Sequence, residues 1–445
     1  MRKNTLFLIA LLCSFTINSQ TFNSKKLDSL FNTIESNNQG MGVISILKKN
    51  QPIYFKSIGY SNTDKNIKGD ENTKYRIGSI SKTYTATIIM QMIDEKKLTL
   101  NSYLDSYFPQ IPNASKITIE DLLRHQSGLF NITEEKDLRT WITKKQSREK
   151  MLARFAKHSV GFQPKEKTSY SNTNYILLSY IAEDIDGKSF STILKNRIIK
   201  PLQLKRTHFG KPINAKRNEA LPYYFENKKW NSITTETHLS APMGAGGVIA
   251  STGDVAKFYM NLFSGKLVSN ISFKKMTDTS KGMGLGMSSL DFKGLKIYGH
   301  DGGIDGFTSF ALHIPKKNIS IAIALNGSST SILPLVISIL EIYFENDSTL
   351  KSKSSYKLTS KDLDQYLGIY SGNTFPAKVT FTKKKNILYA QATGQPLFKL
   401  IAVKKNVFKY DAMGITFSFG SEKDSLSIVF QGKVHQLKKQ IKEKN

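Results

Sequence analysis

Hydrophobic residues spaced for helices occur at the start, in the middle and near the end of the first 345 residues. Between residues 24 and 38 they recur at i, i+3, i+4 and i+7, the spacing of an amphipathic helix. Similar stripes that end in polar or glycine breaks predict further helices. These are expected at residues 83–95, 118–124, 178–185, 190–199 and 332–344.

Short hydrophobic runs on both sides of this helical middle predict β-strands. Runs at 42–47 and 52–59 flank a short polar turn, which is typical of a β-hairpin. Later runs at 297–298, 307–314 and 319–325 lie between Gly, Pro and Asn residues. We therefore predict an α/β (α+β) fold, in which a sheet is flanked by helices and carries a helical insertion.

The C-terminal part has a different pattern. Residues 346–360 are polar, rich in Ser and Lys and without periodicity, so we predict a linker that ends a main domain at 21–345. Over 361–440, hydrophobic runs recur roughly every ten residues, as in a small all-β barrel or sandwich. The runs centre on Val379, Leu388, Phe398, Phe408, Phe417 and Ile428.

The first 20 residues have the layout of a secretory signal. Arg2 and Lys3 precede a hydrophobic run at 6–17, which polar residues follow. The run is too short for a good membrane span, so we expect no transmembrane anchor after signal removal. The expected location is periplasmic or secreted.

Composition removes several classes of chemistry. The 445 residues are 39% hydrophobic and 22% charged, as in a globular protein with a real core. The single cysteine, Cys13, lies in the expected signal, so the folded part has no thiol nucleophile or disulfide. The sequence contains no P-loop, G-x-G-x-x-G or H-E-x-x-H motif, and its histidines lack metal-ligand spacing. We expect no metal and no cofactor.

The net charge of +29 raises nucleic acid or an anionic surface as a partner. The lysines are scattered, however, and no nucleic-acid-binding motif accompanies them. We therefore expect a solvated, Lys-rich surface and no nucleic-acid partner.

The segment with the clearest chemistry is Ser79-Ile-Ser-Lys82, at the start of a strongly hydrophobic helix. Residues three apart on a helix are neighbours, so the Lys82 amine can reach the Ser79 hydroxyl. Burial in the hydrophobic stripe would favour the neutral amine, which can accept the serine proton. The same Ser–Lys spacing also occurs at 45/48, 147/150, 272/275 and 354/357, in strand, linker or exposed helix contexts.

Two more segments add candidate groups. In Tyr170-Ser-Asn172, the phenol can relay a proton and the amide can both donate to and accept from a substrate. The same triplet at 60–62 and a similar one at 259–261 are expected to be a turn and a helix. The glycines of 299–306 (GHDGGIDG) would let a substrate approach the backbone, where N–H groups stabilise an oxyanion. The alternative for this segment is a tight turn.

In this order, the three segments resemble the serine β-lactamase and penicillin-binding protein family, in its branch of class C β-lactamases, DD-peptidases and esterases. Residues 117–129 and 246–254 also resemble signature stretches of that branch, so the resemblance covers roughly residues 24–345. The C-terminal β domain resembles a lipocalin-like extension of some members. The resemblance implies a β-lactamase/transpeptidase-like antiparallel sheet flanked by helices.

The resemblance also implies roles for single residues. Ser79 would be the acylated nucleophile, Lys82 its proton partner and Tyr170 the general base or proton relay. The backbone N–H groups of Ser79 and Gly303 would form the oxyanion hole. The substrate-binding residues would be Asn172, His300, Gly302 and Gly303, whereas His125 is expected to be structural.

Two positions depart from the family pattern. Asp301 replaces the hydroxyl residue that follows the Lys or His of the third motif in β-lactam-active members. Its charge would oppose a substrate carboxylate if it faces the cleft, and strand alternation leaves its orientation open. Lys165 stands where many relatives have glycine, in the loop before Tyr170.

The leading hypothesis is a secreted serine hydrolase that forms an acyl-enzyme on Ser79 and acts on an ester or amide, including D-amino-acid peptides. The alternatives are a DD-carboxypeptidase or β-lactamase, and a catalytically silent cell-wall or ligand-binding protein. The expected partner is a small-molecule or peptide substrate, with cell-wall material as a further candidate.

Overall fold

A computed structural model describes residues 22–347, 356–373, 375–393, 397–410, 415–420, 424–430 and 433–440. The expected signal at 1–20 lies outside the described residues, as does most of the expected linker at 346–360. Both therefore stay predictions.

The main body is built on one antiparallel sheet of six strands. The N-terminal hairpin forms one edge of this sheet. The hairpin that carries the glycine-rich segment forms the other edge. The order is β2 (Gln51–Ile58), β1 (Gly40–Lys48), β11 (Ile319–Ser328), β10 (Phe307–Ile314), β9 (Leu295–Ile304) and β8 (Ser288–Phe292).

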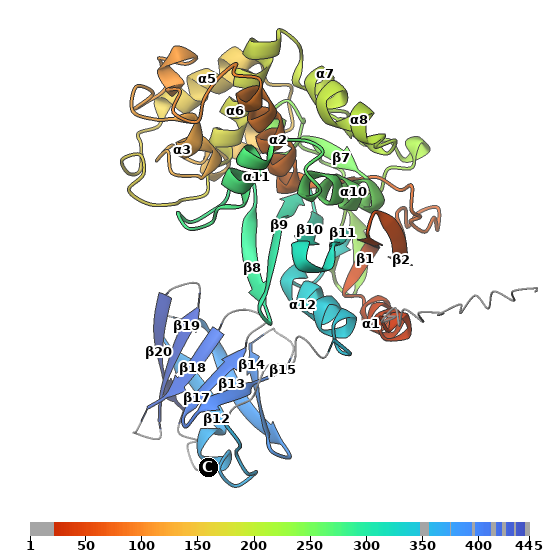
Figure 1. The fold of residues 1–445 in the computed structure, drawn as a ribbon. Helices are drawn as coiled ribbons and strands as arrows, with labels where there is room; N and C mark the ends of the chain where they lie inside the picture. Colours follow the sequence, from red (N-terminus) through yellow and green to blue (C-terminus); the bar gives the residue numbers. More distant parts are fainter. Residues whose placement is uncertain are drawn as a thin grey trace, which may run out of the picture.

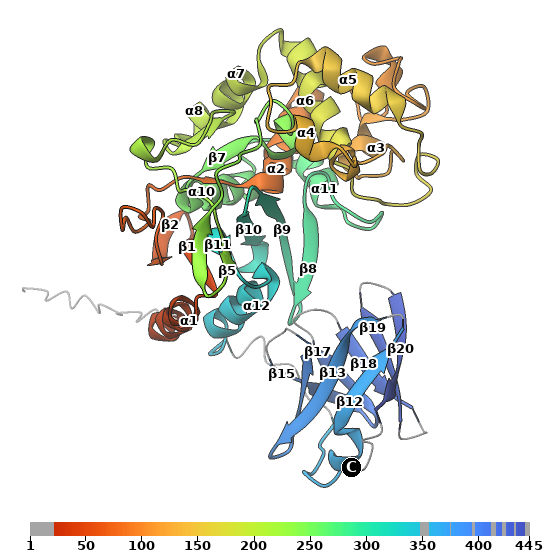
Figure 2. The same cartoon turned by 180° about the vertical axis from the view of Figure 1, so that it is seen from behind.

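Helices cover both faces of this sheet (Figures 1 and 2). Two helices at opposite ends of the body sequence, α1 (Ser24–Ser36) and α12 (Ile332–Tyr343), pack together on one face. On the other face, α10 (Thr252–Phe263) contacts β1, β10 and β11. The predicted antiparallel sheet flanked by helices is thus confirmed.

The helical insertion lies beyond α10 and forms the largest part of the core. Its helices, in chain order, are α2 (Ser81–Asp94), α3 (Ile119–Leu123), α4 (Leu138–Trp141), α5 (Arg148–Lys157), α6 (Asn172–Asp186), α7 (Phe190–Leu194), α8 (Lys200–Leu202), α9 (Met243–Gly246) and α11 (Asn270–Thr277). Two small sheets complete it, made of β3 (Tyr75–Arg76), β7 (Val248–Ala250) and β4 (Thr207–Phe209), and of β5 (Tyr223–Glu226) and β6 (Lys229–Ser232).

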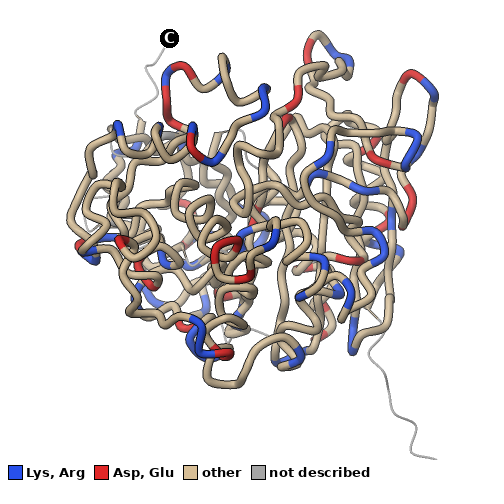
Figure 3. The backbone as a smooth tube through the Cα atoms, turned by 90° about the horizontal axis from the view of Figure 1, so that it is seen from above, with Lys and Arg blue, Asp and Glu red and all other residues tan. Residues whose placement is uncertain are grey.

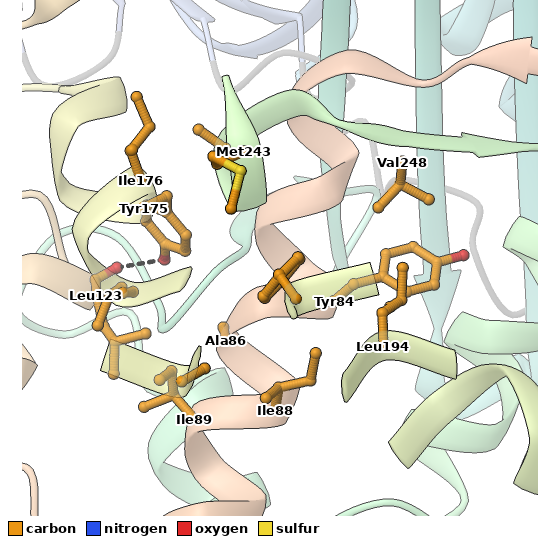
Figure 4. Close-up of a cluster of buried hydrophobic side chains, with 14 of the residues drawn as sticks. Tyr84, Ala86, Ile88, Ile89, Leu123, Tyr175, Ile176, Leu194, Met243 and Val248 are labelled. Atoms are coloured by element: carbon orange, nitrogen blue, oxygen red, sulfur yellow. Dashed lines mark hydrogen bonds between the residues drawn. The ribbon is translucent and has the colours of Figure 1, made fainter. Parts of the chain in front are cut away.

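Helix α2 runs through the centre of this insertion and is buried on nearly all sides. Figure 4 shows its Tyr84, Ile88 and Ile89 packed among side chains from the neighbouring elements. In the same cluster, the Tyr175 hydroxyl on α6 donates to the carbonyl of Leu123 at 2.7 Å. This packing holds the N-terminal end of α2 against the sheet, which is where the predicted nucleophile lies.

The C-terminal part is a nearly closed antiparallel sheet of nine strands, which confirms the predicted barrel-like domain. Every predicted hydrophobic run lies on or within one of its strands. The order is β15 (Phe398–Lys399), β14 (Ile387–Ala392), β13 (Phe375–Lys384), β12 (Gly368–Gly372), β20 (Lys433–Lys439), β19 (Ser425–Phe430), β18 (Ile415–Phe419), β17 (Val407–Tyr410) and β16 (Ile401–Lys404).

The barrel lies next to α12, on the far side of the body from the helical insertion (Figures 1 and 2). Side chains of α12 and of the barrel strands together line a cavity of about 470 Å³. Buried hydrophobic residues also run without a break from the α1–α12 face of the sheet into the barrel. The two parts therefore share one core.

Positive charge is distributed over the molecule. Lys and Arg positions occur on loops and helices around the whole outline in Figure 3, in agreement with the expected Lys-rich surface. Among the described residues, no helix is long and hydrophobic enough to span a bilayer, and no group of three His, Cys, Asp or Glu side chains is arranged to hold a metal ion.

Candidate active site

Ser79 lies in a single 3₁₀ turn, Gly78–Ile80, directly before α2. The turn is pressed against β9: a Cβ atom on Gly78 would lie 2.7 Å from the nitrogen of Gly303, and one on Gly302 would lie 2.1 Å from the carbonyl oxygen of Ile77. Gly78 also has a left-handed φ of +49°. Glycine is required at both contacts because no side chain fits there.

Lys82 is fully buried and lies beside Ser79, as the spacing predicted. Its Nζ is 3.0 Å from Ser79 Oγ, 2.7 Å from Asn172 Oδ1 and 2.8 Å from the carbonyl oxygen of Ala245. A neutral amine has two N–H donors and one lone pair. The two carbonyl-type oxygens can take the two N–H groups, which leaves the lone pair for the hydroxyl hydrogen of Ser79.

Electrostatics favour that neutral form. Burial lowers the pKa of Lys82 well below its usual value, and the negative charge of Asp301 opposes this only in part. A lysine with a lowered pKa can accept the proton of a serine at neutral pH. Burial therefore shifts Lys82 toward the neutral form that a base needs.

Tyr170 completes the group from the segment just before α6. The Lys82 nitrogen is 4.9 Å from the centre of the Tyr170 ring. Burial raises the pKa of Tyr170, and a hydrogen bond with Ser79 works in the opposite direction. The three predicted catalytic side chains are thus brought together, with the phenol in its protonated form at neutral pH.

His125 contacts Tyr170 and the residues on both sides of it, an arrangement that the sequence did not reveal. Its ring stacks on the Tyr170 ring with 4.4 Å between centroids. The residues on either side of Tyr170 are bound to it as well: Ser169 N–H donates to the His125 carbonyl at 2.9 Å, and Ser171 N–H donates to His125 Nδ1 at 3.1 Å. Burial lowers the pKa of His125 well below its usual value, so Nδ1 stays an acceptor.

Asn172 is engaged on both sides of its amide. Its Oδ1 accepts from Lys82, while its Nδ2 donates to Asn131 Oδ1 at 3.1 Å and to Thr133 Oγ1 at 3.2 Å. These partners fix the orientation of the amide. The expected contact of Asn172 with a substrate stays a prediction, and its observed contact is the one with Lys82.

His300 lies on β9 and is only 4% exposed. Its Nδ1 is 2.6 Å from the carbonyl oxygen of Asp301, so Nδ1 carries the hydrogen. Its Nε2 has no partner among the described residues, although it is buried. Burial is the main cause that lowers the pKa of His300 to about 4, so Nε2 presents a lone pair next to the catalytic group at neutral pH.

Both departures from the family pattern have structural consequences. The Asp301 side chain is 74% exposed, with its Oδ1 3.8 Å from His300 Nδ1, and its charge acts on Lys82 and on His300. The Asp301 carboxylate is thus exposed and lies beside His300. Lys165 has a φ of +71°, a left-handed conformation that glycine adopts without strain.

A pocket of about 300 Å³ opens beside Ser79. Gly78, Gly303 and Asn172 line it next to the nucleophile, and Asp305 and Thr237 line another part of it. Sequence reasoning did not select Trp141 or Ile142, because they come from segments without a local motif. It singled out the segment 299–306 for its glycines and gave no role to Asp305 within it. The backbone of Gly303 borders the pocket, and the proposed oxyanion hole there stays a prediction.

Known proteins share this sequence pattern and this fold. The family profile described as Beta-lactamase matches residues 31–332. Teichoic acid D-alanine hydrolase from Staphylococcus aureus is 27% identical over 257 residues, which are 57% of this chain and 60% of that protein. The chain covers about 60% of the length of the curated relatives that it matches.

Two solved structures share the fold. D-amino acid amidase from Ochrobactrum anthropi SV3 has a TM-score of 0.66 at 21% identity, over 74% of this chain and 99% of that one. The octameric penicillin-binding protein homologue from Pyrococcus abyssi has a TM-score of 0.63 at 22% identity, over 94% of this chain and 100% of that one. The second match extends over the C-terminal barrel as well.

Proposed function

The chain belongs to the Beta-lactamase family, and from this premise we propose that it is a serine hydrolase that forms an acyl-enzyme on Ser79 and acts on an ester or amide of a D-amino acid. The observation that carries the proposal is the buried Lys82 amine, held 3.0 Å from Ser79 Oγ while Asn172 Oδ1 and the Ala245 carbonyl accept its two N–H groups. A silent binding protein would have no need for an uncharged, buried lysine at a serine.

In the acylation step, Ser79 Oγ attacks the substrate carbonyl carbon while its proton moves to Lys82 Nζ. The carbonyl oxygen becomes an oxyanion, for which the N–H groups of Ser79 and Gly303 are the candidate donors. As the tetrahedral intermediate collapses, the bond to the leaving group breaks. The proton passes from Lys82, through Tyr170, to the departing alcohol or amine.

In the second step, water replaces the leaving group. Tyr170 and Lys82 take a proton from the water, its oxygen attacks the acyl carbon, and the bond to Ser79 Oγ breaks with return of that proton to the serine. The free acid leaves, and no cofactor enters the balance. His300 Nε2, buried and without a partner among the described residues, is an acceptor that can orient the phenol or the water.

Two relatives support the D-amino acid as substrate. One is named for hydrolysing D-alanine from teichoic acid and the other for cleaving D-amino acid amides. The exposed carboxylate of Asp301 weighs against substrates that need a carboxylate-binding site at this position, such as β-lactams or a terminal D-alanine. Cell-wall polymers that carry D-amino acid esters fit this substrate class.

We also propose that the enzyme acts outside the cytoplasm, in the periplasm or after secretion. The support is the signal-like layout of residues 1–20. N-terminal sequencing of the exported protein should begin near residue 20. Material that starts at Met1 would contradict export by cleavage.

The central test is covalent labelling of Ser79. A fluorophosphonate probe should label the wild-type protein and should not label Ser79→Ala. Ser147→Ala is the matched control, because Ser147 has a lysine at the same spacing but caps an exposed helix, and it should label like the wild type. Labelling of Ser79→Ala at the wild-type level, or no labelling of either protein, would overturn the proposal.

Intact-mass measurement then addresses the substrate. The protein is mixed with D-aminoacyl amides, p-nitrophenyl esters and β-lactams, and the mass of an acyl adduct identifies the class that acylates it. A D-aminoacyl adduct that Ser79→Ala lacks is expected. A stable adduct or rapid turnover with β-lactams alone would favour a penicillin-binding or β-lactamase function instead.

A further inference from the structure

We propose that Asp305 determines substrate specificity by binding a free ammonium group on the acyl part of the substrate. The inference rests on the proposed hydrolase function and adds the residue that selects the substrate. It assigns to the pocket an unblocked amino acid ester or amide with a hydrophobic side chain.

The charge of the pocket is the first observation. Asp305 is the only charged residue among those that line the pocket beside Ser79, and neither Lys nor Arg is among them. The chain as a whole has 64 Lys and Arg against 35 Asp and Glu. A binding pocket with a single carboxylate in such a positive protein is suited to a cation rather than an anion.

The carboxylate of Asp305 is held in a fixed position. Its Oδ1 accepts from the Thr237 N–H at 3.1 Å and from the Thr237 hydroxyl at 2.6 Å, and its Oδ2 pairs with Arg76. The side chain is only 9% exposed. A group placed by three donors needs no rearrangement to meet a ligand.

Arg76 does not cancel this negative charge. The same guanidinium also pairs with Glu236, so one positive charge faces two carboxylates and the trio keeps a net charge of −1. Arg76 is 2% exposed, and its second carboxylate lies outside the pocket lining. The trio therefore keeps one negative charge in excess, and Asp305 is the carboxylate of the trio that lines the pocket.

Asp301 adds a second carboxylate on β9, with its Oδ1 3.8 Å from His300 Nδ1. Its exposed carboxylate would repel a substrate carboxylate and attract an ammonium group that approaches the site. Both acidic residues of the glycine-rich segment thus favour the same substrate charge. Asp301 lies on β9 and Asp305 lies in the turn between β9 and β10, so both belong to the hairpin that also carries Gly303.

The remaining walls define the other part of the substrate. Many of them are hydrophobic: Trp141 ends α4 and Ile142 follows it, Ile132 precedes α4, and Ile176 and Ile304 come from α6 and β9. A pocket of about 300 Å³ with these walls fits an aliphatic or aromatic side chain. The two features together select a hydrophobic amino acid with a free amino group.

The test compares two probes that differ only in that charge. These are D-phenylalanine p-nitroanilide and its N-acetyl derivative, with kcat/KM measured for each. The wild type should prefer the unblocked probe by at least about tenfold, because acetylation removes the ammonium group. Asp305→Asn should reduce this preference by about tenfold or more.

The variant keeps the local fold. Asp305 has a φ of +51° and is the first residue of the two-residue turn Asp305–Gly306, where asparagine is favoured. Asp278→Asn is the matched control, because Asp278 is an exposed carboxylate outside the pocket, and its preference should equal that of the wild type. Asp301→Asn should give a smaller reduction.

The failure of this inference differs from failure of the hydrolase function. Equal or better turnover of the N-acetyl probe, or an unchanged preference in Asp305→Asn, would overturn the role of Asp305 while Ser79 still labels. If neither probe is turned over, protection of Ser79 from the fluorophosphonate by D-phenylalanine amide and by its N-acetyl form measures the same preference. A protein that never labels at Ser79 would remove both proposals.

Discussion

At the scale of single residues, the site depends on groups that burial keeps uncharged. Lys82, His125 and His300 are all buried, and burial is the largest cause of the lowered pKa of each. In water, the pKa values of histidine and lysine lie near or above neutral pH, so these groups would carry a positive charge more often. Their removal from water is therefore what makes them acceptors for protons and N–H groups.

We predict that His125 acts by positioning Tyr170. His125→Asn keeps an acceptor and tolerates the left-handed φ of +56°, but it removes the ring that stacks on Tyr170. The expected result is a fall in kcat of about 10- to 100-fold with little change in KM, because small misplacements of a catalytic group are costly. Steady-state kinetics on an acylating ester measure it.

The control for this prediction is His313→Asn, which changes another buried, neutral histidine outside the pocket. It should leave kcat unchanged even if it lowers the melting temperature. A His125→Asn protein with wild-type kcat and reduced stability would show that His125 is only structural.

We also predict loss of stability in mild acid. The pKa of His300 is about 4 and that of His313 about 3, against an ordinary value of 6.5. The unfolded chain therefore binds protons first as the pH falls, so stability is full above pH 6.5 and is lost progressively toward pH 4. Each histidine should cost roughly 2 kcal/mol between pH 7 and pH 5.

Denaturant unfolding at pH 7.5 and pH 5 measures this loss. His313→Gln should flatten the pH dependence by about the contribution of one histidine, whatever its effect at pH 7.5. An unfolding free energy that is the same at both pH values would contradict neutral burial of these side chains.

At the scale of elements, local pattern and tertiary pairing differ most at β9. The sequence predicted only residues 297–298 as strand, because the glycines that follow weaken any strand signal. In the structure β9 continues to Ile304, paired with β10 along its glycine-rich half and with β8 before it. Neighbouring strands supply the hydrogen bonds that the local sequence does not favour.

Helix α6 shows a similar difference at its start. The hydrophobic stripe predicted a helix from 178, whereas α6 begins at Asn172. Its first turn is polar, so it carries no hydrophobic periodicity. Its residues nevertheless form hydrogen bonds with Asn131, Ser127 and Phe130, which are made only in the folded protein.

The loop before Tyr170 gives a prediction at this scale. Lys165 has a φ of +71°, which costs a non-glycine residue roughly 1 kcal/mol. Lys165→Gly should therefore change stability by between zero and about +1 kcal/mol, the gain being offset in part by the greater freedom of glycine in the unfolded chain. Lys165→Val should destabilise, since a β-branched residue is strained at this φ.

The melting temperatures of Lys165→Gly and Lys165→Val, each compared with that of the wild type, test this prediction. The N–H of Lys165 donates to the Gln126 carbonyl at 2.9 Å, and both substitutions keep that bond. Equal melting temperatures for the Gly and Val variants would show that the backbone here relaxes and that no strain is stored.

At the scale of the whole molecule, the catalytic body and the barrel share a hydrophobic core through α12. Ile337 on α12 is 2% exposed and lies between the sheet and the barrel cavity. We predict that Ile337→Ala destabilises both parts together by about 2 to 4 kcal/mol. The reason is that one face of α12 packs on the sheet and another lines the barrel cavity, so both parts lose contacts when Ile337 is shortened.

Two optical probes can measure this coupling. The only tryptophans of the chain, Trp141 and Trp230, lie in the body, so their fluorescence reports on it alone, whereas far-ultraviolet circular dichroism includes the barrel strands. The two unfolding curves should coincide and shift together in Ile337→Ala, and the exposed barrel substitution Val434→Ala should shift neither. A shift in circular dichroism alone would mean that the barrel unfolds independently.

The sequence by itself determined most strands of the main sheet, the helices near residues 24, 83, 178 and 332, the β-type C-terminal part and the Ser79–Lys82 neighbourhood, because periodicity and an i, i+3 spacing are local properties. It did not predict α5, α10 or α11. Only the tertiary structure decided which side chains meet across segments. His125 reaches Tyr170, Asn172 reaches Lys82 and Asp305 reaches the pocket through chain separations of 45 residues or more. Burial, and with it the pKa of each catalytic base, is likewise a property of the packed molecule, since it depends on atoms from many elements at once.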